Sequence, residues 1–143
     1  MTVTIPLNII GLHDNGFHPL IDIVVYGKPF ILVLDTGASK TAFDHTMLLQ
    51  AHNDVSIQAS DKLSTGLGTN TMASSTALIT DMHIGDLLIA EFEVAVLDLS
   101  SINVAYRQLN HPEVMGVLGG DILTNYKAVI DYGRKVLELH TEQ

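Results

Sequence analysis

Cysteine is absent from this sequence, and its absence excludes several kinds of site at once. A chain without thiols forms no disulfide, offers no thiolate to a metal and has no cysteine nucleophile. Basic residues are also scarce, because 7 Lys and Arg stand against 16 Asp and Glu, which gives a formal net charge of −9. Nucleic acids and anionic membrane surfaces repel such a chain, so neither is expected as a partner.

Long apolar runs are missing as well. No stretch approaches the length that crosses a membrane, and the first residues lack the basic and apolar segments of a secretory signal. We therefore expect a cytoplasmic protein. No repeat, linker or low-complexity segment divides the 143 residues, of which 47% are hydrophobic, so residues 1–143 are expected to form one domain.

The sequence is instead a series of short apolar or alternating segments separated by turn-forming residues, which is typical of a mainly β protein. Turns are expected at residues 11–16, 27–29, 85–86 and 132–133. Strands are expected at residues 2–10, 19–25, 30–34, 77–84, 87–97, 114–118, 127–131 and 135–140, with an extended path at 42–43.

Two or three short helices are expected between these strands. Asp44 can cap a helix that runs to about residue 51, and Asp121 can cap one that runs to about residue 126. A helix over residues 98–110 can begin at Asp98 or Ser100. Its apolar face is expected to consist of Ile102, Ala105, Tyr106 and Leu109.

The stretch from Phe30 to Ser39 stands out, because an apolar run is followed by a carboxylate, a hydroxyl and a glycine. The apolar run predicts a strand that is covered on both faces. Asp35 follows this strand directly, where a carboxylate is costly unless it has a function. Gly37 permits a tight turn that lets backbone N–H groups face the carboxylate. The stretch therefore predicts an active site at the mouth of a buried strand.

A second segment, at about residues 56–80, is rich in small, hydroxyl-bearing and glycine residues. Two glycines spaced by one residue, Gly66 and Gly68, give its centre a backbone that can move and lie close over a ligand. Taken alone, the segment is typical of an ordinary surface loop.

Together these features resemble a retropepsin-like aspartic protease, particularly the single-domain bacterial members. The resemblance covers nearly the whole chain and implies a mainly β, closed, barrel-like fold with a flap hairpin and two or three short helices. It rests on Leu34-Asp35-Thr36-Gly37-Ala38-Ser39, on the flap around Gly66 and Gly68, and on Val117-Leu118-Gly119-Gly120-Asp121-Ile122-Leu123 followed by Ala128-Val129-Ile130-Asp131-Tyr132.

This resemblance implies an aspartic endopeptidase that needs no cofactor. Two carboxylates that share one proton let one act as a base on water while the other protonates the substrate carbonyl. The sequence has a single Asp-Thr/Ser-Gly motif, so the second carboxylate is expected from Asp35 of another copy in a two-fold homodimer. Such an enzyme would cleave an extended peptide or protein substrate. The alternative is a retropepsin-like binding or scaffold domain that seldom cleaves.

By the same resemblance, Asp35 is the catalytic residue, and the active site is supported by Thr36, Gly37, Ala38 and Gly119. Thr36 would tie the two loops together across the dimer axis, and Gly119 would lie behind the loop where no side chain fits. Ala38 stands where pepsin-type enzymes usually place a serine whose hydroxyl bonds the catalytic carboxylate, so we expect activity at mildly acidic to near-neutral pH. The implied substrate-binding positions of the flap and floor are Ser39, Thr65, Gly66, Leu67 and Gly68.

Two features depart from the retroviral members of the family. Ser39 stands where they commonly carry an acidic residue, and few residues follow the last expected strand to interleave with a partner, so the dimer is expected to be built differently.

The seven histidines show no helical i, i+4 pair and no His-Glu-x-x-His motif, so no metal site is expected. Asp131 is expected to flank a turn before Tyr132-Gly133.

Overall fold

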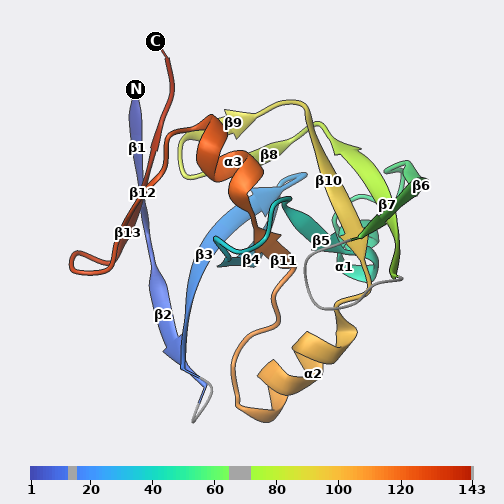
Figure 1. Cartoon of the computed structure of the whole chain (residues 1–143), viewed down its shortest axis with the longest axis horizontal. Helices are drawn as coiled ribbons and strands as arrows, with labels where there is room; N and C mark the ends of the chain where they lie inside the picture. Colours follow the sequence, from blue (N-terminus) through green and yellow to red (C-terminus); the bar gives the residue numbers. More distant parts are fainter. Residues whose placement is uncertain (13–15, 65–71, 143) are drawn as a thin grey trace.

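The computed structural model describes residues 1–12, 16–64 and 72–142 and confirms a mainly β protein (Figure 1). Three short helices lie between the strands of the described residues: α1 (His45–Ala51), α2 (Ser100–Gln108) and α3 (Gly120–Asn125). The strands are β1 (Thr2–Pro6), β2 (Asn8–Gly11), β3 (Phe17–Val25), β4 (Lys28–Leu34), β5 (Ala42–Asp44), β6 (Ile57–Ser64), β7 (Met72–Ile79), β8 (Met82–Ile84), β9 (Leu87–Ile89), β10 (Phe92–Leu97), β11 (Gly116–Leu118), β12 (Val129–Asp131) and β13 (Val136–His140).

These strands form two sheets. The larger one has the order β6-β7-β10-β5-β11-β4-β3-β8-β9, with β2 also paired to β3, and the smaller one has the order β1-β13-β12. The small sheet lies at one side of the molecule, where the two termini meet (Figure 1). Within the described ranges the large sheet ends at β6 and β9 and does not close, so the predicted barrel-like closure is not confirmed.

The main hydrophobic core joins the two sheets. It contains Val3 and Leu139 from the small sheet, Leu32 and Phe43 from the large sheet, and Leu48 from α1. Burial of these apolar side chains is the main force that holds the sheets together. Asp44 caps α1 as predicted, because its carboxylate accepts the N–H of Met47 at 3.0 Å.

Strand β11 occupies the position that organises the candidate site. It lies between β4 and β5, parallel to β4 and antiparallel to β5. Leu118 is paired with Leu34, the last residue of β4. The residues that follow β11 are therefore placed beside the residues that follow β4, although about 80 positions separate them in the sequence.

Three of the predicted strands are each divided in two. The strand expected at residues 2–10 changes sheet at Leu7, because β1 pairs with β13 whereas β2 pairs with β3. The strand expected at 77–84 breaks at Thr80, whose N–H donates to the Tyr26 hydroxyl at 3.1 Å. The strand expected at 87–97 breaks between β9 and β10, which have different partners. Alternating hydrophobicity continues through a change of partner, so the sequence does not mark these breaks.

The turn between β3 and β4 lies one residue earlier than predicted. Tyr26 and Gly27 form it with φ values of 50° and 78°, the backbone of a two-residue hairpin loop. Pro29, expected in the turn, lies inside β4 opposite Val24.

Helix α2 buries only part of the predicted face, since Tyr106 is buried and Leu109 is half-buried as expected. Ile102 and Ala105 are exposed, whereas Asn103 and Tyr106 are buried. Asn103 is buried because its side chain pairs with the backbone of Val114, donating to the carbonyl at 3.0 Å and accepting the N–H at 2.7 Å. Neither expected residue is the N-cap, which is Leu99, but Asp98 accepts the N–H of Ser100 at 3.0 Å. Hydrogen bonds from Ser100 lower the pKa of Asp98.

The predicted flap falls on β6 and β7, which form an antiparallel hairpin. The residues between these strands, which include all four predicted flap positions, lie outside the described residues: Thr65, Gly66, Leu67 and Gly68.

Candidate active site

Asp35 stands directly after β4, at the start of the loop that leads to β5. Its N–H donates to the carbonyl of Leu118 at 3.0 Å, and its side chain is half-buried. The N–H of Gly37 donates to Asp35 Oδ1 at 3.0 Å. A Cβ at residue 37 would lie 3.4 Å from the same oxygen, which is an ordinary van der Waals distance.

The other predicted residues of the loop lie around this carboxylate. Thr36 and Ser39 are exposed, and Ala38 is half-buried. The Ala38 methyl group cannot donate a hydrogen bond. In the part of the chain that the structure describes, the Gly37 N–H is the one donor to the Asp35 carboxylate. The carboxylate is therefore held on one side and accessible from the other.

The loop after β4 is bound to the start of α3 through main-chain hydrogen bonds. The N–H of Gly120 donates to the Ala38 carbonyl at 2.7 Å, and the N–H of Asp121 donates to the Ser39 carbonyl at 3.1 Å. With the bond from Asp35 to Leu118, these contacts fix the loop along its length. Because no side chain takes part, the contacts depend on how closely the two segments approach.

Two glycines make that approach possible. A Cβ on Gly119 would lie 2.6 Å from the carbonyl group of Lys40 and 2.9 Å from the Thr41 nitrogen. A Cβ on Gly116, in β11, would overlap the carbonyl oxygen of Ala42 in the neighbouring strand. Gly119 is one of the predicted supporting residues. Gly116 was missed, and its signal was a glycine inside an apolar strand, which indicates a close backbone neighbour.

Asp121 is not the N-cap of α3, although the sequence predicted that role for it. The N-cap of α3 is Gly119, without a side-chain bond, and Asp121 lies in the first turn. Its carboxylate accepts the N–H of Thr41 at 2.9 Å and the Thr41 hydroxyl at 2.8 Å. An aspartate before a helical segment is typical of an N-cap, so the sequence predicted one. The prediction was wrong because the partner of this carboxylate is Thr41, which lies 80 residues away.

An apolar floor crosses the sheet on the side of Asp35. Val33, two residues before Asp35, is paired with Val117 in β11, which is paired with Ala42 in β5, and Ala42 is paired with Ala95 in β10. Paired residues in neighbouring strands share one face of a sheet. Val33, Val117 and Ala95 are half-buried, because they pack in part against small apolar clusters, so the row leaves part of its apolar surface exposed. Sequence reasoning missed it because strand order, not spacing, brings the four residues together.

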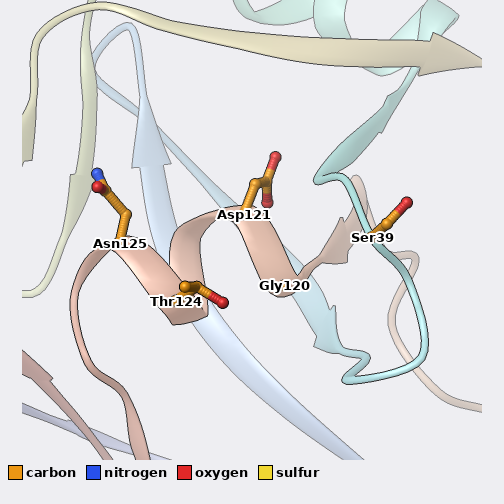
Figure 2. A pocket seen from close by; sticks show the side chains of 5 residues that line it. All are labelled: Ser39, Gly120, Asp121, Thr124 and Asn125. Carbon is orange, nitrogen blue, oxygen red and sulfur yellow. The ribbon is translucent and has the colours of Figure 1, made fainter.

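A hollow of about 490 Å³ opens next to the loop. Figure 2 shows the residues that line it, with Ser39 on the loop side and the others on α3. The residues that line it are Ser39, Gly120, Asp121, Thr124 and Asn125.

Asp131 lies away from this loop. It accepts the Arg134 N–H at 2.9 Å and Arg134 Nε at 2.8 Å, in keeping with the expected turn-flanking role. These hydrogen bonds and the Arg134 charge lower the pKa of Asp131.

Among the residues described, no group of three or more His, Asp or Glu could hold a metal ion. The described helices include none that is long and apolar enough to cross a membrane.

Comparison with known proteins gives a consistent result. Residues 21–122 match a family model described as aspartyl protease. The fold is similar to that of a retropepsin-like aspartic protease from Rickettsia conorii, with a TM-score of 0.60 and 18% identity over 97% of this chain and 89% of that one. No curated protein matches the sequence.

Two further solved structures have a similar fold. EIAV protease in complex with an inhibitor has a TM-score of 0.59 and 18% identity, covering 80% of this chain and 92% of that chain. The retroviral protease-like domain of Ddi1 from Leishmania major has a TM-score of 0.53 and 12% identity, covering 86% of this chain and 88% of that chain. At these identities the likeness to the three structures is one of fold.

Proposed function

Since the chain belongs to the aspartyl protease family and has a retropepsin-like fold, as its motifs indicated, we propose that it is an aspartic endopeptidase that acts as a homodimer. The observation that carries this proposal is the half-buried Asp35 carboxylate, held by the Gly37 amide at the mouth of a central strand. The chain supplies one such aspartate, so a second copy would supply the other.

In the proposed mechanism, the two Asp35 carboxylates share one proton across the dimer axis. The ionised carboxylate takes a proton from water, and the water oxygen forms a bond to the peptide carbonyl carbon. The other carboxyl group gives its proton to the carbonyl oxygen. The C–N bond then breaks as the nitrogen receives the proton that the first carboxylate took from water, while one hydroxyl of the tetrahedral intermediate returns its proton to the second carboxylate. This leaves a carboxylic acid, an amine and a dyad that again holds one proton. Thr36, exposed on the same loop, is proposed to hold the two loops together across the axis.

The proposed substrate is an extended peptide or unfolded protein. Val33 and Val117 give the floor beside Asp35 an apolar surface suited to apolar substrate side chains. Ser39, exposed at the end of the loop, is proposed to contact the substrate backbone. The predicted flap positions would cover the peptide from the opposite side and remain part of the proposal: Thr65, Gly66, Leu67 and Gly68.

The shared site predicts that activity depends on protein concentration. Dilution should lower the rate per chain once protomers separate, because a single protomer holds half of the dyad. Hydrolysis of casein should be followed over a wide dilution series, and sedimentation velocity should be measured on the same samples. The rate per chain is expected to fall in parallel with the dimer fraction. A strict monomer, or a constant rate per chain across dimer dissociation, would favour the binding or scaffold alternative.

Ala38 leads to a prediction about pH. A serine hydroxyl at this position could donate to the Asp35 carboxylate and stabilise its ionised form, whereas the Ala38 methyl group cannot. We therefore expect wild-type activity at mildly acidic to near-neutral pH and expect Ala38→Ser to move the acidic limb of the kcat/KM profile to lower pH. The sign follows because stabilising the ionised form delays its protonation as the pH falls. A wild-type optimum well below pH 4, or a shift toward higher pH in the variant, would contradict this account.

A further inference from the structure

Thr41, which is buried, and Asp121, which is half-buried, link the two segments that make up the candidate active site. We infer that both are positioning residues, which hold the loop of residues 35–41 at the geometry that catalysis requires. The kinetic part of this inference rests on the proposed function, whereas its structural part does not.

The Thr41 hydroxyl has a partner in each direction. It accepts the N–H of Gly119 at 3.0 Å and donates to Asp121 Oδ1 at 2.8 Å. Thr41 is fully buried, with 0% exposure, so water cannot reach its hydroxyl without rearrangement. A hydroxyl is both a donor and an acceptor, so serine can make both bonds and valine can make neither.

Among the described residues, the Asp121 carboxylate makes hydrogen bonds to donors only. Its Oδ1 accepts the Thr41 N–H at 3.0 Å, the Thr41 hydroxyl at 2.8 Å and the Ile122 N–H at 2.8 Å, and its Oδ2 lies 2.9 Å from the Thr41 nitrogen. An ionised carboxylate suits this arrangement because it is an acceptor on both oxygens. The amide of an asparagine would turn an NH₂ group toward the Thr41 N–H or Ile122 N–H.

The link acts on Asp35 through the ends of the loop. Asp35 begins the loop with its bond to Leu118, and Thr41 ends it immediately before β5. Between them, the Ala38 and Ser39 carbonyls accept N–H groups from the same turn of α3 that carries Asp121. If the two hydroxyl bonds of Thr41 are lost, the far end of the loop is held only by the Thr41 N–H and carbonyl, and the Asp35 carboxylate is held less closely. A misplacement of about 1 Å can lower a catalytic rate by about 100-fold.

Thr41→Val and Thr41→Ser form the matched test, because valine keeps the shape and serine keeps the hydroxyl. Peptide hydrolysis should show kcat lowered by about 10-fold to 100-fold in Thr41→Val with little change in KM, and kcat within about threefold of wild type in Thr41→Ser. Ile84→Val, in the buried strand β8 away from the loop, controls for a general loss of stability.

Hydrogen exchange followed by mass spectrometry gives a second readout that does not need activity. Exchange in residues 35–41 and 118–121 should become faster in Thr41→Val than in wild type, and should remain at the wild-type rate in Thr41→Ser and Ile84→Val. Asp121→Asn serves as a second variant if Thr41→Val does not fold, and is expected to accelerate exchange in the same two segments.

The outcomes separate the inference from the proposed function. If wild type hydrolyses no peptide, the proposed function fails, and the exchange data still decide whether the link holds the loop. Unchanged exchange in Thr41→Val, or equal defects in Thr41→Val and Thr41→Ser, would overturn the inference. A defect in Ile84→Val as large as that in Thr41→Val would overturn it as well, because the loop would then respond to stability alone.

Discussion

Replacement of Asp35 by asparagine is expected to lower kcat for peptide hydrolysis by about 10³-fold or more. The asparagine side chain has nearly the same shape, and its oxygen can still accept the Gly37 N–H that now bonds Oδ1 at 3.0 Å. It cannot take a proton from water, and it cannot share a proton with a second carboxylate. The loop should therefore survive while proton transfer is lost. Initial rates with a peptide substrate, together with melting curves of both proteins, measure the two effects.

Asp86→Asn is the matched control for Asp35→Asn. Asp86 is exposed in the turn between β8 and β9, so its replacement makes the same change in charge away from the loop. Its activity is expected to equal that of wild type. Peptide hydrolysis that persists in Asp35→Asn at the rate of Asp86→Asn would refute the proposed mechanism.

Mixing the Asp35→Asn variant with wild type tests whether the site is shared. A mixed dimer holds one carboxylate, so excess variant should draw wild-type chains into inactive pairs. At an about threefold excess, random pairing leaves about a quarter of the wild-type chains with an active partner. The rate should fall accordingly after exchange of protomers is complete. An unchanged rate would show that each chain acts alone.

The parts of the site that are contiguous in sequence were predictable. The apolar run before Asp35 indicates a strand, although β4 is fully buried on one face only, at Leu32 and Leu34, and Gly37 indicates a turn whose N–H faces the carboxylate. The cap at Asp44 was predictable for the same reason, because a helix cap depends on residues three positions apart.

Contacts between distant segments were not predictable in this way. The pairing of β11 with both β4 and β5 brings Thr41 to Asp121 and Val33 to Val117, and no local pattern encodes that strand order. Asp121 illustrates the difficulty, because an aspartate at the start of a helix fits a cap equally well. Burial of Asn103 in α2 was missed for a similar reason, since its side chain bonds to the distant Val114 backbone.

Gly119→Ala is expected to lower the free energy of unfolding by about 3 kcal/mol or more, which shifts the melting temperature by about 10 °C. The added methyl group would meet the Lys40 carbonyl at 2.6 Å and the Thr41 nitrogen at 2.9 Å, both of which belong to backbone. Backbone cannot change rotamer to make room. Thr41 is also held from other sides, because its N–H donates to Asp121 and its carbonyl accepts the Ala95 N–H at 3.0 Å.

Gly116→Ala should be at least as damaging, because its Cβ would overlap the Ala42 carbonyl oxygen inside the central sheet. Gly120→Ala provides the neighbouring control. Its Cβ would lie 3.5 Å from the Ala38 carbonyl oxygen, its nearest neighbour, and alanine favours a helix over glycine by up to about 1 kcal/mol. Urea and thermal unfolding of the three variants should therefore show two strongly destabilised proteins and one close to wild type. The close approach of the two backbones holds the Asp35 loop in place. If the Gly119→Ala variant proved as stable as Gly120→Ala, the loop and the start of α3 could not approach each other in this way.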